Sequence, residues 1–135
     1  MEYRFKVSWG DTDAAGIVFY PNFYKWMDKA SHHFFSTLGC STSQLFKEKI
    51  GLPIIEAKCQ FHSPLLFDDD VCIRSSIEEL RDKAFKIQHQ FLKEGIKVAE
   101  GYEIRIWAKF HGENLKAVPI PEEVRRKMMK TQMTM

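Results

Sequence analysis

The feature that most constrains this fold is a change of apolar period along the chain. In residues 22–38, apolar side chains recur at three- and four-residue steps, which predicts one amphipathic helix of roughly four turns. The residues of this stripe are Phe23, Trp26, Met27, Ala30, Phe34 and Leu38. Gly39 is well placed to end the helix. A single long helix of this kind must bury its apolar face against other elements.

Much of the remaining chain alternates apolar and polar residues, as half-buried strands do. The segments expected to be strands are 3–9, 55–62, 71–80, 85–91, 96–110 and 115–120. The connections at 81–83 and 93–95 have the length of hairpin loops, which favours antiparallel neighbours. We therefore expect an α+β fold in which a curled antiparallel sheet covers the long helix.

Shorter helices are predicted on either side of the strands. Ser41 followed by Gln44 is a capping-box signature and predicts a helix that runs to Ile50. Pro121 suits the first turn of a C-terminal helix. The tail, residues 130–135, is expected to fray.

Length and composition exclude several classes of protein. A chain of 135 residues supports one core, so we expect a single domain over residues 1–135. A formal net charge of +2 with mixed signs does not indicate a nucleic-acid-binding protein. The three cysteines fit neither a disulfide framework nor a zinc site. No segment resembles a secretory signal or a membrane span, so we expect a cytoplasmic protein with no metal.

The loop between the first expected strand and the long helix is where chemistry is most strongly indicated. It holds Asp11 and Asp13, flanked by two glycines. Because the loop leads into a helix N-terminus, its carboxylates lie near unpaired N–H groups that attract negative charge. A carboxylate beside an oxyanion-binding amide is a hydrolytic arrangement. The ordinary alternative is an aspartate that hydrogen-bonds its own backbone, and we keep that interpretation for Asp11.

The string GDTDAAGIVFYPNF, residues 10–23, resembles the 4-hydroxybenzoyl-CoA thioesterase family of hotdog-fold acyl-CoA thioesterases. Looser matches at 69–70, 83–85 and 116–119 extend the resemblance over nearly the whole chain in the same order. The resemblance implies a five-stranded antiparallel sheet wrapped around the long helix. It also implies a homodimer with active sites at the subunit interface, assembled further into a homotetramer.

The resemblance implies roles for individual residues. Asp13, three residues before the second glycine, matches the catalytic carboxylate, and the backbone N–H of Tyr20 matches the group that polarises the thioester carbonyl. The length of the match outweighs the ordinary interpretation of Asp13. The sequence leaves open whether Asp13 attacks the carbonyl or acts as a general base on water.

Four residues are expected to bind the substrate. Gly16 allows a positive φ or a close approach of the substrate. Arg81, Lys83 and Lys116 match positions where the family places basic side chains against the nucleotide of CoA. Asp82 departs from the family pattern, and solvated basic side chains at strand ends are the alternative interpretation.

The expected activity is hydrolysis of an acyl-CoA to a free acid and CoA, without a bound cofactor. A non-catalytic acyl-CoA-binding protein on the same fold is the first alternative. A hotdog hydratase is the second, but the loop 11–22 contains no histidine for it. We expect His89 to be a hydrogen-bonded core residue and Cys59 a buried, inert thiol. The acyl group, and the choice between CoA and an acyl carrier protein, stay open at this point.

Overall fold

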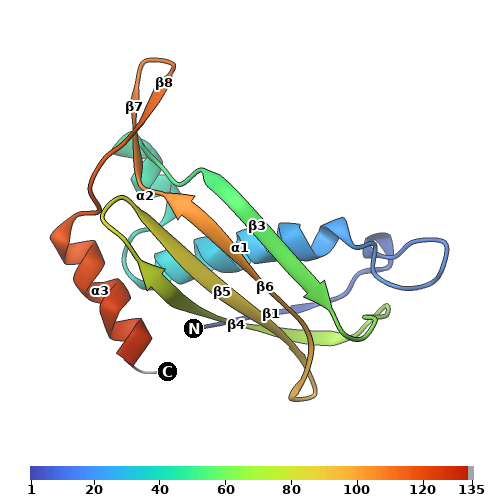
Figure 1. Cartoon of the computed structure of the whole chain (residues 1–135). Helices are drawn as coiled ribbons and strands as arrows, with labels where there is room; N and C mark the ends of the chain where they lie inside the picture. Colours follow the sequence, from blue (N-terminus) through green and yellow to red (C-terminus); the bar gives the residue numbers. More distant parts are fainter. Residues whose placement is uncertain (134–135) are drawn as a thin grey trace.

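The structure is a computed structural model that describes residues 1–133. A five-stranded antiparallel sheet curves around helix α1 (Pro21–Thr37), as Figure 1 shows. The strands are β1 (Glu2–Lys6), β3 (Ile54–Phe61), β4 (Asp70–Leu80), β5 (Ala84–Lys93) and β6 (Ile96–Ile106). They lie in the order β1-β4-β5-β6-β3, and every neighbouring pair is antiparallel. The predicted α+β hotdog architecture is confirmed.

The core follows the apolar stripe of α1. Near the start of the helix, Phe23 contacts Phe91 of β5 with ring centroids 5.2 Å apart. Near its end, Phe35 contacts Phe85 of the same strand, also at 5.2 Å. Gly39 follows the helix with φ at +83°, the left-handed conformation expected of a glycine at this position. The helix is therefore held against the sheet along most of its length.

The first strand is shorter than predicted. β1 ends at Lys6, and Trp9–Asp11 forms a 3-10 turn, η1, in place of a further stretch of strand. The carboxylate of Asp11 accepts the Ser8 N–H at 2.8 Å, which bends the chain out of the ladder. As a result Trp9 is 78% exposed, although its place in the alternation had put it on the apolar face.

The predicted strand 96–110 is wrong beyond Ile106. Trp107 is buried, and its N–H still donates to the Lys83 carbonyl at 2.8 Å, next to β5. Its carbonyl instead accepts the Val118 N–H at 2.9 Å, so the chain leaves the main sheet at this residue. The next residues form β7 (Ala108–His111) and β8 (Asn114–Ala117), so the expected strand 115–120 is β8. This hairpin pairs with β2 (Ile50–Gly51) and projects from the body of the molecule (Figure 1).

The two shorter helices form, with changed ends. Helix α2 (Thr42–Lys47) is capped by Ser41, whose Oγ accepts the Gln44 N–H at 3.2 Å. It stops before Ile50, which instead belongs to β2. Helix α3 (Glu122–Met133) includes residues 130–133 that were expected to fray. The rest of that expectation, residues 134–135, lies outside the described residues.

Candidate active site

The loop before α1 folds back on itself as a small hairpin. Thr12 pairs with Val18 in an isolated β-bridge, and the Asp13 N–H donates to the Ile17 carbonyl at 2.9 Å. Gly16 closes the turn with its N–H on the Asp13 carbonyl at 2.9 Å and has φ at +82°. A Cβ on Gly16 would meet open space, so within this chain the positive φ, and not a close approach, requires glycine.

The two carboxylates of this loop are held differently. Oδ1 of Asp13 accepts the Ala15 N–H at 2.8 Å, whereas Oδ2 has no hydrogen-bond partner within residues 1–133. The Asp13 side chain is exposed. Asp11 instead holds the turn through Ser8, which agrees with the structural interpretation kept for it. Each carboxylate therefore keeps one oxygen without a partner within residues 1–133, and Asp13 is the more exposed of the two residues.

One backbone N–H at the entry to α1 has no acceptor. The Phe19 N–H donates to the Asp11 carbonyl at 2.8 Å, and the Asn22 N–H donates to the Phe19 carbonyl at 3.0 Å. Pro21 has no N–H. Tyr20 lies between them in a helical conformation, and its N–H has no acceptor in the described part of the chain. Its position at the positive end of α1 makes this N–H a donor for an anion.

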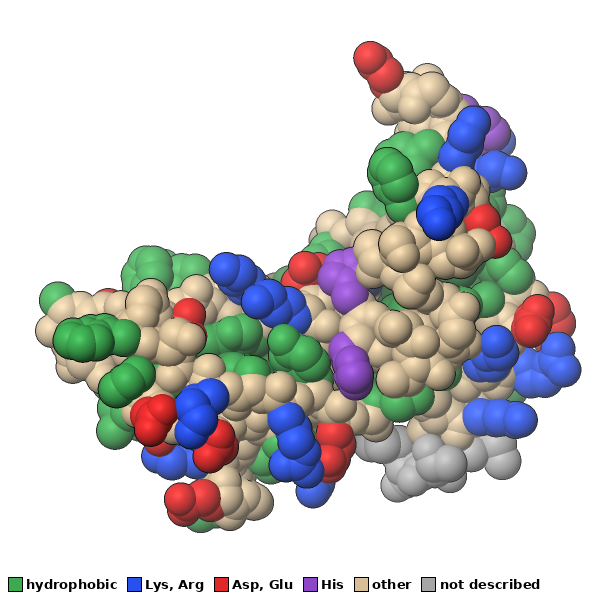
Figure 2. Space-filling model, turned by 180° about the vertical axis from the view of Figure 1, so that it is seen from behind, with side chains coloured by type: hydrophobic (Ala, Val, Ile, Leu, Met, Phe, Trp, Pro, Cys, Tyr) green, Lys and Arg blue, Asp and Glu red, His purple; other side chains and the backbone are tan. Residues whose placement is uncertain are grey.

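An apolar cavity of about 410 Å³ lies beside this loop. Its lining includes Ile17, Val18, Tyr20, Phe23, Phe61 and Leu65. Phe23 and Phe61 form one wall as an edge-to-face pair with centroids 4.9 Å apart. Apolar side chains also gather on the surface at this end of the molecule (Figure 2), where Trp9 and Phe67 are both more than half exposed. Asp13 is not among the lining residues, but Ile17, Val18 and Tyr20 of its loop are, so the cavity could hold an apolar group next to the loop.

The expected nucleotide-binding residues lie at the other end of the sheet. The loop 9–20 is joined to the residues just before β4, since the Val18 N–H donates to the Leu65 carbonyl. Arg81 and Lys83 follow the far end of β4, whose 11 residues span roughly 30 Å. The structure therefore brings Asp13, Gly16 and Tyr20 into one group, and it does not bring Arg81, Lys83 and Lys116 to that group within one chain.

Cationic side chains without acidic partners gather on the projecting hairpin. Lys109 and Lys116 lie directly opposite each other in the β7–β8 ladder, and neither makes an ion pair with another residue of 1–133. His111, two residues after Lys109, is on the same face of the strand. Like charges placed opposite each other across a ladder are destabilising. This face is therefore suited to an anion, and Figure 2 shows the basic side chains at this end.

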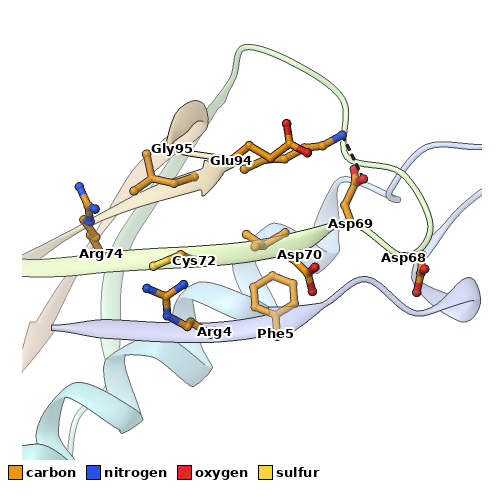
Figure 3. A pocket seen from close by; sticks show the side chains of 12 residues that line it. Arg4, Phe5, Asp68, Asp69, Asp70, Cys72, Arg74, Glu94 and Gly95 are labelled. Atoms are coloured by element: carbon orange, nitrogen blue, oxygen red, sulfur yellow. Dashed lines mark ion pairs between the residues drawn. The ribbon is translucent and has the colours of Figure 1, made fainter.

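A second cavity, of about 740 Å³, lies at the β1–β4 edge near the β5–β6 turn (Figure 3). Its lining mixes basic residues with the acids Asp68, Asp69, Asp70 and Glu94. Lys93 is already paired with Asp69 at 3.0 Å. The thiol of Cys72 in its wall has a raised pKa because of its burial, so it is no nucleophile. The accumulated negative charge makes this cavity a poor site for CoA phosphates.

A buried polar network between α1 and the sheet is the feature that the sequence analysis missed. His89 is fully buried as expected, with Nδ1 2.7 Å from Ser75 Oγ and Nε2 3.0 Å from Ser31 Oγ. Ser31 also donates to Glu103 at 2.5 Å, and Arg105 Nε donates to the same Glu103 oxygen at 2.9 Å. Glu103 and Arg105 two residues apart on an inward-facing strand were the available signal.

This network is closed to chemistry. Burial by itself would raise the pKa of Glu103, but hydrogen bonds from His89, Arg105 and Ser31, together with the Arg105 charge, lower it to about 2. Its far end reaches Asp28 on α1, which accepts from Arg105 at 2.7 Å. Elsewhere in the core, burial raises the pKa of the Cys59 thiol to about 12, which agrees with the expected inert thiol.

The described residues contain neither a cluster of metal ligands nor a membrane-spanning helix. Among residues 1–133, no group of three or more His, Cys, Asp or Glu side chains is placed to hold a metal ion. None of the helices in this range is both long and apolar enough to cross a bilayer.

Comparison with known proteins identifies relatives along most of the chain. Residues 7–128 match the family model described as the thioesterase-like superfamily. A 4-hydroxybenzoyl-CoA thioesterase of Pseudomonas sp. (strain CBS-3) is 32% identical over 87% of this chain and 89% of its own length. A 1,4-dihydroxy-2-naphthoyl-CoA hydrolase of Microcystis aeruginosa is 26% identical over 93% of this chain and 90% of its own.

Solved structures agree with these relatives. A gentisyl-coenzyme A thioesterase is 58% identical and superposes with a TM-score of 0.87 over 93% of this chain and 99% of that one. A 4-hydroxybenzoyl-CoA thioesterase, crystallised with 4-hydroxybenzoyl-CoA as an aspartate-to-asparagine mutant, is 29% identical with a TM-score of 0.87 over 95% and 97% of the two chains. The resemblance seen in the sequence is confirmed by both kinds of comparison.

Proposed function

Because this chain belongs to the thioesterase-like superfamily, we propose that it is an acyl-CoA thioester hydrolase that releases a free carboxylic acid and CoA. One observation carries the proposal: two groups with no hydrogen-bond partner within residues 1–133 belong to the same small loop. They are Oδ2 of Asp13, which accepts no hydrogen bond, and the backbone N–H of Tyr20, which has no acceptor. A nucleophile or base and an oxyanion donor are the two groups that thioester hydrolysis needs.

The proposed chemistry uses one water per turnover. Asp13 either attacks the thioester carbonyl to form a mixed anhydride, which water then hydrolyses, or removes a proton from a water that attacks directly. On both routes the bond from the carbonyl carbon to sulfur breaks, and the CoA thiolate leaves and takes up a proton. The Tyr20 N–H donates to the oxyanion, and a donor in such a site contributes about 3 kcal/mol to the barrier reduction.

We propose that the active unit is a homodimer, with a homotetramer as the larger assembly. The edge strand β3 leaves Ile54 43% and Ile55 58% exposed, and a second copy would cover such an edge. An antiparallel arrangement would place the loop 9–20 of one copy near the basic end of its partner. Arg81, Lys83 and Lys116 of that partner would then reach the CoA phosphates of a substrate bound at Asp13.

The acyl group is proposed to be a hydroxylated aromatic ring. Three of the relatives are a gentisyl-coenzyme A thioesterase, a 4-hydroxybenzoyl-CoA thioesterase and a 1,4-dihydroxy-2-naphthoyl-CoA hydrolase, and the first of them is 58% identical to this chain. The apolar cavity with its Phe23–Phe61 wall is compatible with a flat ring, which packs edge-to-face on aromatic side chains. Gly16 would leave room for the substrate beside the turn.

The proposal is tested by thiol release from a panel of acyl-CoAs with aromatic and aliphatic acyl groups. The wild-type protein is expected to prefer the aromatic esters, and Asp13→Asn is expected to lower turnover by at least about 10³-fold while staying folded and oligomeric. Asp11→Asn, the same change two residues away, is the matched control and should retain most activity because an amide oxygen still accepts the Ser8 N–H. Full turnover by Asp13→Asn would remove Asp13 from its role.

The same panel decides between the hydrolase and its alternatives. Tight acyl-CoA binding without thiol release would indicate the non-catalytic binding protein. Hydration of an enoyl-CoA would indicate the hydratase. His89 is fully buried in the polar network, so it is not available for that reaction.

A further inference from the structure

Asn22, in the first turn of α1, connects the helix to the carboxylate loop. Its side-chain Nδ2 donates to the Asp11 carbonyl at 2.9 Å. No other side-chain hydrogen bond joins α1 to residues 9–19 in the described part of the chain. The side chain is partly buried, which protects the bond from competing water.

This bond lies between the two groups of the proposed reaction. Asp13 follows Asp11 by two residues on the loop, and Tyr20 precedes Asn22 by two residues at the helix entry. The carboxylate and the N–H donor therefore belong to segments whose relative position depends on the connection through Asn22. Since a misplacement of about 1 Å between reacting groups can cost about 10²-fold in rate, this connection bears directly on turnover.

The same bond also occupies an acceptor. The Asp11 carbonyl has two lone pairs, and it receives the Asn22 amide and the Phe19 N–H, the latter at 2.8 Å. Both acceptor positions are therefore in use. Without the Asn22 amide, the Phe19 N–H would be the single donor left on this carbonyl from the helix entry.

We infer that Asn22 is a positioning residue for thioester hydrolysis: it orients the Asp13 loop against the helix entry that carries the Tyr20 N–H. This inference rests on the proposed function. Asn22 does not itself touch the reacting atoms. Its loss should therefore lower the rate of the chemical step and leave the binding of the substrate unchanged.

The test compares Asn22→Ala and Asn22→Asp with wild type in thiol release from the best acyl-CoA of the panel. We expect kcat to fall 10- to 100-fold for both, with KM within twofold of wild type and a small change in the thermal midpoint. Asn22→Asp keeps the size of the side chain but removes the donor and adds a negative charge, whereas Asn22→Ala removes the donor without a charge, so a fall in both variants follows from the lost hydrogen bond. Should Asn22→Ala fail to fold, Asn22→Asp carries the measurement.

Thr12→Val is the matched control. It removes a hydrogen bond within the same loop, from Thr12 Oγ1 to the Trp9 carbonyl at 2.7 Å, which does not reach the helix. We expect its kcat to stay within twofold of wild type. An equal fall in Thr12→Val would show that general loop integrity is responsible and would overturn the inference.

The remaining outcomes separate this inference from the proposed function. An active wild type with Asn22→Ala at nearly full kcat overturns the inference alone, and so does a rise of KM with unchanged kcat. A wild type that releases no thiol from any ester, or an Asp13→Asn variant with full turnover, overturns the proposed function and this inference with it.

Discussion

Two acidic side chains of this protein, Glu103 and Asp13, show opposite uses of a carboxylate. Glu103 is 1% exposed and receives hydrogen bonds from Ser31 and Arg105. Asp13 is exposed and uses one of its oxygens on the Ala15 N–H, while the other is unoccupied. The well-bonded carboxylate stabilises the core, whereas the under-bonded one is free to react. Burial together with hydrogen bonds from two side chains therefore separates Glu103, a structural acid, from Asp13, a catalytic candidate.

The largest effect expected from this comparison is on stability. Glu103→Ala removes the buried acceptor of Ser31 and Arg105 and leaves Arg105 with Asp28 as its single acidic partner, which should lower the free energy of unfolding by about 3 kcal/mol. Asp13→Asn should change it by less than about 0.5 kcal/mol, because the site is exposed. Urea denaturation of both variants measures the difference. A similar fall in the free energy of unfolding for both variants would contradict the assignment of Glu103, and not Asp13, as the structural acid.

The stabilisation that Glu103 contributes should be lost over a defined range of acidic pH. Its pKa is about 2 in the folded protein against an ordinary value of 4.5, so the unfolded chain binds the proton first. The stabilisation, roughly 3 kcal/mol, is complete above pH 4.5 and disappears as the pH falls toward about 2. Unfolding free energies measured from pH 6 to pH 2 test this. The decline between pH 4.5 and pH 2 should be shallower in Glu103→Gln than in wild type.

Two glycines, Gly101 in β6 and Gly16 in the loop of Asp13, should respond differently to replacement by alanine. A Cβ on Gly101 of β6 would lie 2.3 Å from the Lys58 carbonyl oxygen and 2.7 Å from Met27 Sδ, so overpacking should cost about 3 kcal/mol. Gly16→Ala meets open space and carries only the positive-φ cost, about 1 kcal/mol. Thermal midpoints of both variants rank the two costs. A larger loss in Gly16→Ala would contradict the packing seen around β6.

The smallest effect is expected at Tyr20. The proposed role uses its backbone N–H, and its hydroxyl has no hydrogen-bond partner within residues 1–133. Tyr20→Phe should therefore change kcat by less than about twofold. A fall of 10-fold or more in steady-state thiol release would show that the hydroxyl group participates, and it would shift the electrophilic role from the main chain to the side chain.

Local sequence patterns predicted the fold well where one period dominates a segment. The stripe from Phe23 to Leu38 predicted α1, and Ser41 with Gln44 predicted the start of α2. The prediction failed where a long-range bond ends an element. Trp107 continues the alternation of β6, yet its carbonyl accepts the Val118 N–H, and no local pattern contains that partner. The single-domain expectation for residues 1–135 stays a prediction.

In the candidate site, too, local sequence related some of the residues to one another and not the others. The spacing within the loop 10–23 was sufficient to single out Asp13, Gly16 and Tyr20, because residues close in sequence are close in a short hairpin. It was not sufficient to relate them to Arg81, Lys83 and Lys116. Those positions depend on the course of β4, which carries the chain to the far end of the molecule. Their roles as catalytic and substrate-binding residues remain proposals.

The sequence by itself determined the periods of the elements, the starts of the helices and the residues of the acidic loop, because these depend on neighbours within a few residues. Tertiary structure alone decided that Asp13 has an unoccupied oxygen, that Glu103 and Arg105 are buried against α1, and that the basic hairpin lies far from the loop. The physical reason is that hydrogen-bond saturation and burial depend on partners from distant segments, which only the folded chain brings together.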